Sequence, residues 1–404
     1  MNHGDTGECQ PRSPQEALDL MRERIGPVST QSVGIDECGG RVLGAAVRAD
    51  RDHPAASISA MDGYALALAD VRAGAVPVSA TGAIGKPPPM RTPGAAVRIV
   101  TGGALPTGTD VVVPRERVVE EGATIRIGEQ ATSELRAGQN IRPRGANARA
   151  GDVVAPAGAL VTPALAAALA TFGVARPTVF APVRVGILLT GDELLGVADT
   201  PSPYQIRDSN GACLTALLRP HAWVRVLPVA RCGDDYDQTL GAVRALLPHV
   251  DALITSGGVS MGDRDHVPAA LRECGATVLF HKLPQRPGRP MLGAVMGDGR
   301  PIFGLPGNPL STLITARRIM LPALEKSAGL STPTGPTAFL TLDPAPGKSI
   351  SLWWHRPVRR TGADRCVILD LTGSGDIPAS ALSDGFIEMP PDGVGAGPWP
   401  FYEW

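Results

Sequence analysis

Between residues 179 and 327, short apolar runs alternate with helix-like ones. The strand-like runs are V-R-V-G-I-L-L (183–189), W-V-R-V-L-P-V (223–229), A-L-I-T (252–255), A-T-V-L-F (276–280) and P-I-F-G-L (301–305). Helical patterns occupy 208–219, 234–248, 266–274 and 308–325. Strands that alternate with helices are typical of βαβ units. The pattern predicts an α/β domain on a parallel, doubly wound sheet.

The segments on either side of this region have different sequence patterns. Apolar residues at helical spacing after Ser13-Pro14 predict a helix that ends near residue 26, and Thr162-Pro163 begins a second helix that ends by 172. Short Val- and Ile-bearing runs broken by Gly, Pro and Thr predict a small β domain over 53–141. After a linker at 330–337, the alternating C-terminal runs predict a small β-barrel or sandwich.

Composition narrows the class of protein. The 404 residues suffice for two to four domains, and 43% apolar with 19% charged residues is ordinary for a globular chain. A net charge of −1 gives no reason to expect nucleic acid or an anionic membrane as partner. There is no apolar run of spanning length, the first residues do not resemble a secretory signal, and the six cysteines are scattered. We therefore expect a cytoplasmic protein with reduced thiols.

Glycine-bearing loops follow three of the predicted strands, and the first two also carry hydroxyls and carboxylates. The segments are T-G-D-E-L (190–194), S-G-G-V-S-M-G-D-R-D (256–265) and P-G-N-P (306–309), with Asn308 as N-cap and Pro309 as first helical residue. In an open parallel sheet the carboxyl ends of the strands form the ligand crevice. Glycine lets backbone N–H groups approach an anion, although any one such loop is equally consistent with helix capping alone.

The acids in these loops favour a divalent cation between protein and phosphate. Glu193, Asp263 and Asp265 would repel an anionic ligand unless Mg²⁺ bridged them, and carboxylates with substrate oxygens are a usual magnesium arrangement. Asp234, after the strand at 223–229, could join them, but a role as helix N-cap or first-turn acid is at least as consistent with its position.

A basic loop follows the strand at 276–280. It carries Lys282, Arg286 and Arg289 among prolines and a glycine. Three cations on a stiff loop suit a phosphate, a pyrophosphate or a tetrahedral oxometalate, and a solvated basic turn is the alternative.

Two weaker motifs lie in the N-terminal half. S-A-M-D-G-Y-A (59–65) places Asp62 in a tight turn, and R-I-V-T-G-G (98–103) ends a strand at Thr101. Either could be a β-turn without a ligand.

Taken together, the motifs resemble the molybdopterin molybdenumtransferase family, which includes the C-terminal domain of gephyrin. The resemblance depends on 59–65, R-I-V-T-G-G-A-L-P-T-G-T-D-V-V-V (98–113), 190–194, D-S-N-G (208–211), G-G-V-S-M-G-D-R-D (257–265), R-P-G-R-P (286–290) and L-P-G-N-P (305–309). They stand in the family's order over about 250 residues.

The resemblance implies an architecture and a reaction. The domains would be an elongated one (1–52 with 142–178), an inserted β domain (53–141), a molybdopterin-binding α/β domain (179–327) and a C-terminal β-barrel (328–404). The chain would form a homodimer, with the site between the α/β domain of one subunit and the β domain of the other. It would insert molybdate into adenylylated molybdopterin, made upstream by molybdopterin adenylyltransferase, and release AMP and molybdenum cofactor with Mg²⁺ required.

Residue roles follow from the same resemblance. The catalytic residues would be Asp62, Thr101, Glu193, Asp234 and Asp265, and Glu193 and Asp265 would also be metal ligands. Pterin, phosphates and molybdate would be bound by Ser256, Gly257, Gly258, Ser260, Lys282, Arg286, Arg289, Pro306, Gly307, Asn308 and Pro309.

The chain departs from the family pattern at three places. Arg289 replaces the usual lysine, Ala146 and Asn147 replace two carboxylates, and the tail G-A-G-P-W-P-F-Y-E-W replaces a valine-rich strand. Alternatives to the enzyme are a molybdopterin-binding paralogue or carrier without turnover, a gephyrin-like scaffold and the related adenylyltransferase. The retained acids favour the enzyme, because a scaffold has no need for mutually repelling carboxylates.

Overall fold

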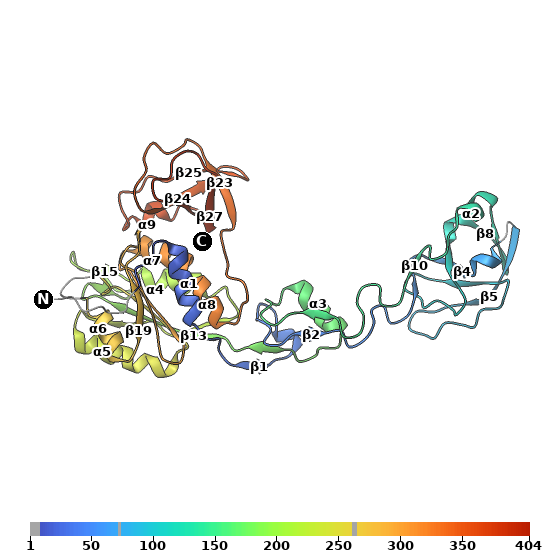
Figure 1. Cartoon of the computed structure of the whole chain (residues 1–404), viewed down its shortest axis with the longest axis horizontal. Helices are drawn as coiled ribbons and strands as arrows, with labels where there is room; N and C mark the ends of the chain where they lie inside the picture. Colours follow the sequence, from blue (N-terminus) through green and yellow to red (C-terminus); the bar gives the residue numbers. More distant parts are fainter. Residues whose placement is uncertain (1–8, 72–73, 261–264) are drawn as a thin grey trace. The chain divides into compact units, whose positions relative to one another are not determined.

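The computed structural model describes residues 9–71, 74–260 and 265–404, and Figure 1 labels many of its helices and strands. The chain divides into two compact units. The first comprises residues 1–45, 157–166 and 175–404, and the second comprises 46–156 and 167–174. The finer division into four domains stays a prediction.

A seven-stranded sheet forms the centre of the first unit within the described residues. Its order is β16-β13-β18-β22-β21-β19, and β17 also pairs with β13. The bounds are β13 (Val183–Thr190), β16 (Val224–Val226), β17 (Ala230–Cys232), β18 (Ala252–Ser256), β19 (Thr277–His281), β21 (Leu292–Val295) and β22 (Pro301–Leu305). Pairings among β16, β17, β13, β18 and β22 are parallel, whereas β21 is antiparallel to both of its neighbours.

Helices cover both faces of this sheet, which confirms the doubly wound α/β fold. Val185 and Ile187 of β13 lie in one core with α1 (Pro14–Arg24), α4 (Asn210–Leu218) and α8 (Leu321–Ser327). Leu188 points to the opposite core, with α5 (Tyr236–Leu246) and α6 (Val267–Glu273). This division follows from the two-residue period of a strand, which sends successive side chains to opposite faces.

Three details differ from the sequence prediction. The run at 223–229 is not one strand, because Pro228 has no N–H to donate and the pairing with β13 breaks between β16 and β17. Strand β21 was missed, and it turns the expected all-parallel sheet into a mixed one. The helix expected at 308–325 consists of α7 (Pro309–Thr315), the π-helical segment η5 (Ala316–Met320) and α8.

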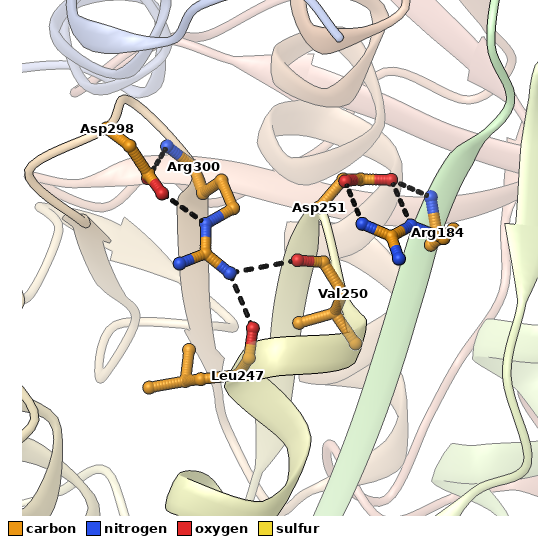
Figure 2. Close-up of polar contacts among 6 residues, drawn as sticks. All are labelled: Arg184, Leu247, Val250, Asp251, Asp298 and Arg300. Atoms are coloured by element: carbon orange, nitrogen blue, oxygen red, sulfur yellow. Dashed lines mark hydrogen bonds and ion pairs between the residues drawn. The ribbon is translucent and has the colours of Figure 1, made fainter. Parts of the chain in front are cut away.

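Ion pairs and hydrogen bonds fasten the amino-terminal ends of the strands (Figure 2). Arg184, in β13, donates from Nε and Nη2 to the Asp251 carboxylate at 2.9 and 2.8 Å, just before β18. Arg300, just before β22, donates to the carbonyls of Leu247 and Val250 at 2.5 and 3.0 Å. The loops that follow β13, β18 and β22 lie at the opposite, carboxyl-terminal edge of the sheet. Ligands bind at this edge in such sheets.

The C-terminal segment forms the expected β-barrel. Its strands are β23 (Ala338–Leu342), β24 (Trp353–Arg360), β25 (Arg365–Ile368), β26 (Gly385–Met389) and β27 (Trp399–Glu403), with the short helix α9 (Ile377–Ser380). The ring closes because β24 pairs with both β25 and β26. Strand β20 (Gln285–Arg286), from the basic loop, pairs with Trp353 and Trp354 of β24 and so joins barrel and α/β sheet.

The first unit also contains two short strand pairs. Strand β1 (Thr30–Ser32) pairs with β12 (Thr178–Phe180), and β14 (Leu194–Leu195) pairs with β15 (Ile206–Arg207). Helix α3 (Pro163–Thr171), predicted at 162–172, contributes residues to both units.

The second unit is β-rich, as predicted. Among the described residues its six-stranded sheet contains β4 (Gly63–Leu66), β5 (Gly74–Thr81), β6 (Ala96–Ile99), β7 (Val111–Pro114), β8 (Val118–Glu121) and β9 (Thr124–Ile127). Helix α2 (Glu129–Glu134) and the pairs β2–β11 (Val47–Arg48, Val153–Ala155) and β3–β10 (Ile58–Ser59, Ile141–Arg142) complete it.

Candidate active site

A cavity of about 500 Å³, the first cavity, lies where strands β13, β17, β18 and β22 end. All four strand-end loops contribute to its lining. It brings together the predicted residues Glu193, Asp234, Ser256, Gly257, Gly258, Ser260, Asp265, Pro306, Gly307, Asn308 and Pro309. Asp263 of the same loop lies outside the described residues.

The loop after β18 is built for close backbone approach. Gly257 and Gly258 have φ of +92° and +63°, a region that L side chains rarely adopt. A Cβ on Gly257 would lie 2.5 Å from the Thr190 carbonyl oxygen, so only glycine lets the loop pack against the end of β13. Ser256 is buried, and its hydroxyl donates to the Pro306 carbonyl at 3.0 Å. Ser256 therefore holds two strand ends together.

Two lining residues of the first cavity, Asn210 and Asp208, were not given a role from the sequence. Asn210 Nδ2 donates to Ser256 Oγ and to the Gly307 carbonyl, and its buried Oδ1 has no hydrogen-bond partner among the described residues. Asp208, 4% exposed, pairs with Arg231 at 2.8 Å and accepts from Gly211 N–H. The motif D-S-N-G was visible in the sequence, but its contacts join segments distant along the chain.

The acids of the first cavity come from separate loops. A Cβ on Gly191 would meet the Glu193 carboxylate at 2.7 Å, so that glycine leaves room for it. The helix cap of α5 is Asp235, which accepts from Gln238 N–H at 2.9 Å, and Asp234 instead lines the cavity. Within the described parts of the chain, no three His, Cys, Asp or Glu side chains are grouped to hold a metal by themselves.

A second cavity of about 600 Å³ adjoins the first. Pro290, Asn308 and Ser311 line both. Its walls come from the basic loop and from the barrel, which the pairing of β20 with β24 holds together. Arg286 and Arg289 line it, whereas Lys282 lines neither of these two cavities.

A third arginine, Arg356 of β24, also lines the second cavity. Its guanidinium lies 4.1 Å from the Trp354 ring centroid. Burial lowers the pKa of Arg356, Asp370 opposes this shift, and the like charge of Arg286 adds to it. The like charges of these two guanidinium groups repel each other, so an anion close to both would be stabilised. From the sequence alone, nothing distinguished Arg356 from other strand arginines.

Asp62 and Thr101, in the second unit, contact each other. Asp62 Oδ1 accepts hydrogen bonds from Thr101 N–H and Oγ1 at 2.7 and 2.8 Å. The backbone hydrogen bond, followed by the hydroxyl one, lowers the pKa of Asp62. Both residues are exposed, and these hydrogen bonds favour the ionised form of the carboxylate.

Comparison with known proteins identifies the family. Residues 12–173 match the model described as the MoeA N-terminal region (domain I and II), and residues 186–326 match a probable molybdopterin binding domain. The molybdopterin molybdenumtransferase of Haemophilus influenzae is 33% identical over 318 residues, 78% of this chain and 77% of that protein. The chain belongs to the molybdopterin molybdenumtransferase family. A Synechocystis molybdopterin molybdenumtransferase is 29% identical over 96% of this chain and 98% of its own length.

Solved structures of the family share the fold. A structure described as the molybdopterin biosynthesis moeA protein from Pyrococcus horikoshii OT3 matches with a TM-score of 0.80 at 22% identity, covering 98% of each chain. None of the helices in the described parts of the chain combines the length and the apolar composition that a membrane-spanning helix needs.

The departures from the family pattern have local explanations. Asn147 Nδ2 lies 3.1 Å from His53 Nδ1, and Asn147 N–H donates to the His53 carbonyl, so Asn147 itself is held by His53, while the neighbouring Arg144 pairs with Asp52. Arg289 retains a cation in the second cavity. The aromatic tail packs the barrel onto α7, since Tyr402 stacks on Phe386 with ring centroids 5.1 Å apart in a cluster with Leu310 and Ile314.

Proposed function

We propose that the chain inserts molybdate into adenylylated molybdopterin and releases AMP and molybdenum cofactor. One observation carries the proposal: an acid-bearing, glycine-rich cavity adjoins a basic cavity, with Pro290, Asn308 and Ser311 lining both. A nucleotide-linked pterin and a tetrahedral oxyanion that must react together need two such adjoining compartments. Family membership gives the chemistry, and the cavities supply a place for each reactant.

The first cavity takes the pterin and its phosphates. The 256–260 loop cradles the terminal phosphate of the pterin, and the helix that begins at Asn308-Pro309 directs its positive dipole end at the same charge. Asn210 and Ser256 keep these loops in place before the ligand arrives. Preorganised loops reduce the ordering cost that binding has to overcome.

The acids of the first cavity fit Mg²⁺. Magnesium in such sites is bound through one or two carboxylates together with substrate phosphates and water, so Glu193 and Asp265 suffice as its protein ligands. When bound, Mg²⁺ offsets the negative charge of the phosphates. Asp234 and Asp265 orient the water or molybdate oxygen that cleaves the phosphoanhydride, and AMP leaves.

The second cavity takes molybdate. Arg286, Arg289 and Arg356 offer planar forks of N–H donors that match tetrahedral oxygens. Lys282, half-buried at the start of the basic loop, lines neither cavity and adds positive charge to the loop that carries Arg286 and Arg289.

A homodimer completes the proposal. Asp62 and Thr101 form an exposed, hydrogen-bonded pair, and the partner copy would present this pair to the first cavity. The pair would position the adenylyl leaving group or its metal-bound phosphate.

Product analysis tests the proposal. Purified protein with adenylylated molybdopterin, Mg²⁺ and molybdate is expected to yield equal amounts of AMP and of a molybdenum-bearing pterin, measured by chromatography and mass spectrometry. Tight binding of the adenylylated pterin without either product would instead favour a carrier.

A further inference from the structure

Arg207 lines the first cavity, and the proposed reaction does not use it. It is the second residue of β15, and it is exposed. Four carboxylates line the same cavity, those of Glu193, Asp208, Asp234 and Asp265. Among the described residues of this lining, Arg207 is the one cation. Since opposite charges attract strongly at short distance, an ion pair between Arg207 and one of these acids would be the ordinary outcome.

The guanidinium of Arg207 is nevertheless unpaired with any carboxylate in the described parts of the chain. Its Nε donates to the backbone carbonyl of Asp199 at 3.0 Å, and its two Nη groups make no hydrogen bond with a described residue. The Asp199 carboxylate accepts from Gly196 N–H at 2.9 Å, and Asp208 pairs with Arg231 at 2.8 Å. Arg207 is therefore anchored to a neutral group through one N–H, and its charge and Nη hydrogens remain available to a ligand.

The backbone on both sides of Arg207 is held by the segment that carries Glu193. Ile206 N–H donates to the Glu193 carbonyl at 2.8 Å, and Asp208 N–H donates to the Leu195 carbonyl at 3.0 Å. Leu195 is the register partner of Arg207 in the β14–β15 pair. The cation and a proposed metal ligand thus belong to one small ladder. This ladder positions both before a ligand binds, which reduces the ordering cost of binding.

The proposed substrate contains two phosphates joined as a phosphoanhydride, and each carries negative charge. The 256–260 loop and the start of α7 bind the phosphate of the pterin in the proposed function, while the adenylyl phosphate has no protein cation assigned to it. In a cavity lined by acids, that phosphate would be repelled unless a cation faced it. A guanidinium suits this role, because its planar fork of N–H donors matches two oxygens of a phosphate.

We propose that Arg207 binds the adenylyl phosphate through its Nη groups and is a specificity-determining residue for the adenylylated form of molybdopterin. Molybdopterin without the adenylyl group has no second phosphate for this guanidinium, so it gains nothing from Arg207. The carbonyl of Asp199 orients the fork through Nε. The inference rests on the proposed function, since it assumes that the first cavity takes the adenylylated pterin.

Equilibrium binding of two ligands tests this role. Full-length wild type and Arg207→Gln are titrated anaerobically with adenylylated molybdopterin and with molybdopterin, in the presence of Mg²⁺ and without molybdate. Because hydrogen bonds to charged groups are strong, we expect the affinity of Arg207→Gln for the adenylylated form to fall about tenfold or more, and that for molybdopterin to change by less than about twofold.

Two further variants separate charge, geometry and general effects. Arg207→Lys keeps the charge without the planar fork, so it should recover part of the lost affinity. Arg225→Gln is the matched control, because Arg225 is also an exposed arginine of a short strand, β16, and does not line the first cavity. Its affinities for both pterins should equal those of the wild type. The thermal midpoints of all variants check that they fold, as is expected for substitutions of exposed side chains.

The outcomes are distinct. A wild type that binds neither pterin would remove the proposed function, and the role of Arg207 with it. If the wild type binds the adenylylated form and Arg207→Gln binds it equally well, Arg207 does not contact the adenylyl phosphate. Equal losses of affinity for the two pterins would likewise overturn the specificity role. Neither of the last two results would affect the proposed function.

Discussion

The side-chain amide of Asn210 donates to Ser256 Oγ at 2.9 Å and to the Gly307 carbonyl at 2.8 Å. Ser256 Oγ in turn donates to the Pro306 carbonyl at 3.0 Å. One amide at the start of α4 thereby connects the loops after β18 and β22. The first cavity is shaped by contacts within the protein, so its binding properties should respond to changes that displace these loops.

Gly257→Ala should disturb the first cavity while leaving the fold intact. The new Cβ would lie 2.5 Å from the Thr190 carbonyl oxygen, at a φ of +92°. The loop must shift, and we expect the affinity for adenylylated molybdopterin to fall by about tenfold or more, since strain of this kind costs about 1–3 kcal/mol. Fluorescence titration measures it.

Gly241→Ala is the matched control for that substitution. Gly241 lies inside α5, and an added Cβ there would have no atom within 4 Å. Alanine favours a helix by about 1 kcal/mol over glycine, so this variant should bind as the wild type does and be no less stable. Equal ligand affinities for the two variants would contradict a role for the 256–260 loop.

Arg356→Gln should weaken the use of molybdate. The guanidinium is one of three in the second cavity, and a charge-assisted hydrogen bond contributes about 1.5–3 kcal/mol. We expect the KM for molybdate to rise about tenfold or more, with a smaller change in kcat, in steady-state assays of AMP release. Arg365→Gln is the control, because the Arg365–Asp343 ion pair is largely exposed. An unchanged KM for Arg356→Gln would remove this arginine from the site.

Acid should weaken the contact between barrel and helix at Glu388. Burial by itself would raise the pKa of Glu388, but the His355 hydrogen bond and the charge of Arg318 outweigh it and lower the pKa to about 2, from 4.5. The folded pKa is the lower one, so this stabilisation is complete above about pH 4.5 and is lost as the pH falls towards 2. The thermal midpoint of the wild type should drop more steeply over this range than that of Glu388→Gln. If the thermal midpoints of the two proteins change in parallel with pH, Glu388 does not provide this stabilisation.

Mixing two inactive variants tests the dimer. Asp62→Ala and Asp265→Ala should each lose activity, because each site would use Asp265 of one copy and Asp62 of the other. After subunit exchange at equal amounts, half of the dimers are mixed and each has one complete site, so about a quarter of wild-type AMP release should return. If a mixture whose exchange is verified by native mass spectrometry stays inactive, the two residues do not act across a dimer.

The sequence predicted more of the α/β domain than of the contacts within its site. The strands at 183–189, 252–255 and 301–305 were recognisable because the pattern of strands and helices repeats, and their loops were correctly placed at one sheet edge. The interruption by Pro228 and the reversed strand β21 were not recognised, since a short run such as L-G-A-V carries no sign of its direction. Strand direction depends on pairing with β19 and β22, which sequence spacing does not specify.

Residues of the second cavity show the same limit. Arg286 and Arg289 could be recognised as candidate site residues in the sequence because they lie close together on one short loop. Arg356 and His355 come from the barrel, and they reach the cavity only because β20 pairs with β24. Such a strand pairing between segments some 70 residues apart cannot be predicted from the local sequence of either segment.

The most direct test of the account is the rate of AMP release by Asp265→Asn beside that of the wild type, with adenylylated molybdopterin, Mg²⁺ and molybdate. Asparagine keeps the size of the side chain and removes its charge. The account predicts molybdate-dependent AMP release by the wild type. The variant should release AMP at a rate reduced by about 100-fold or more, and it should still bind the adenylylated pterin. Wild-type rates in Asp265→Asn would show that the acids of the first cavity do not carry the chemistry.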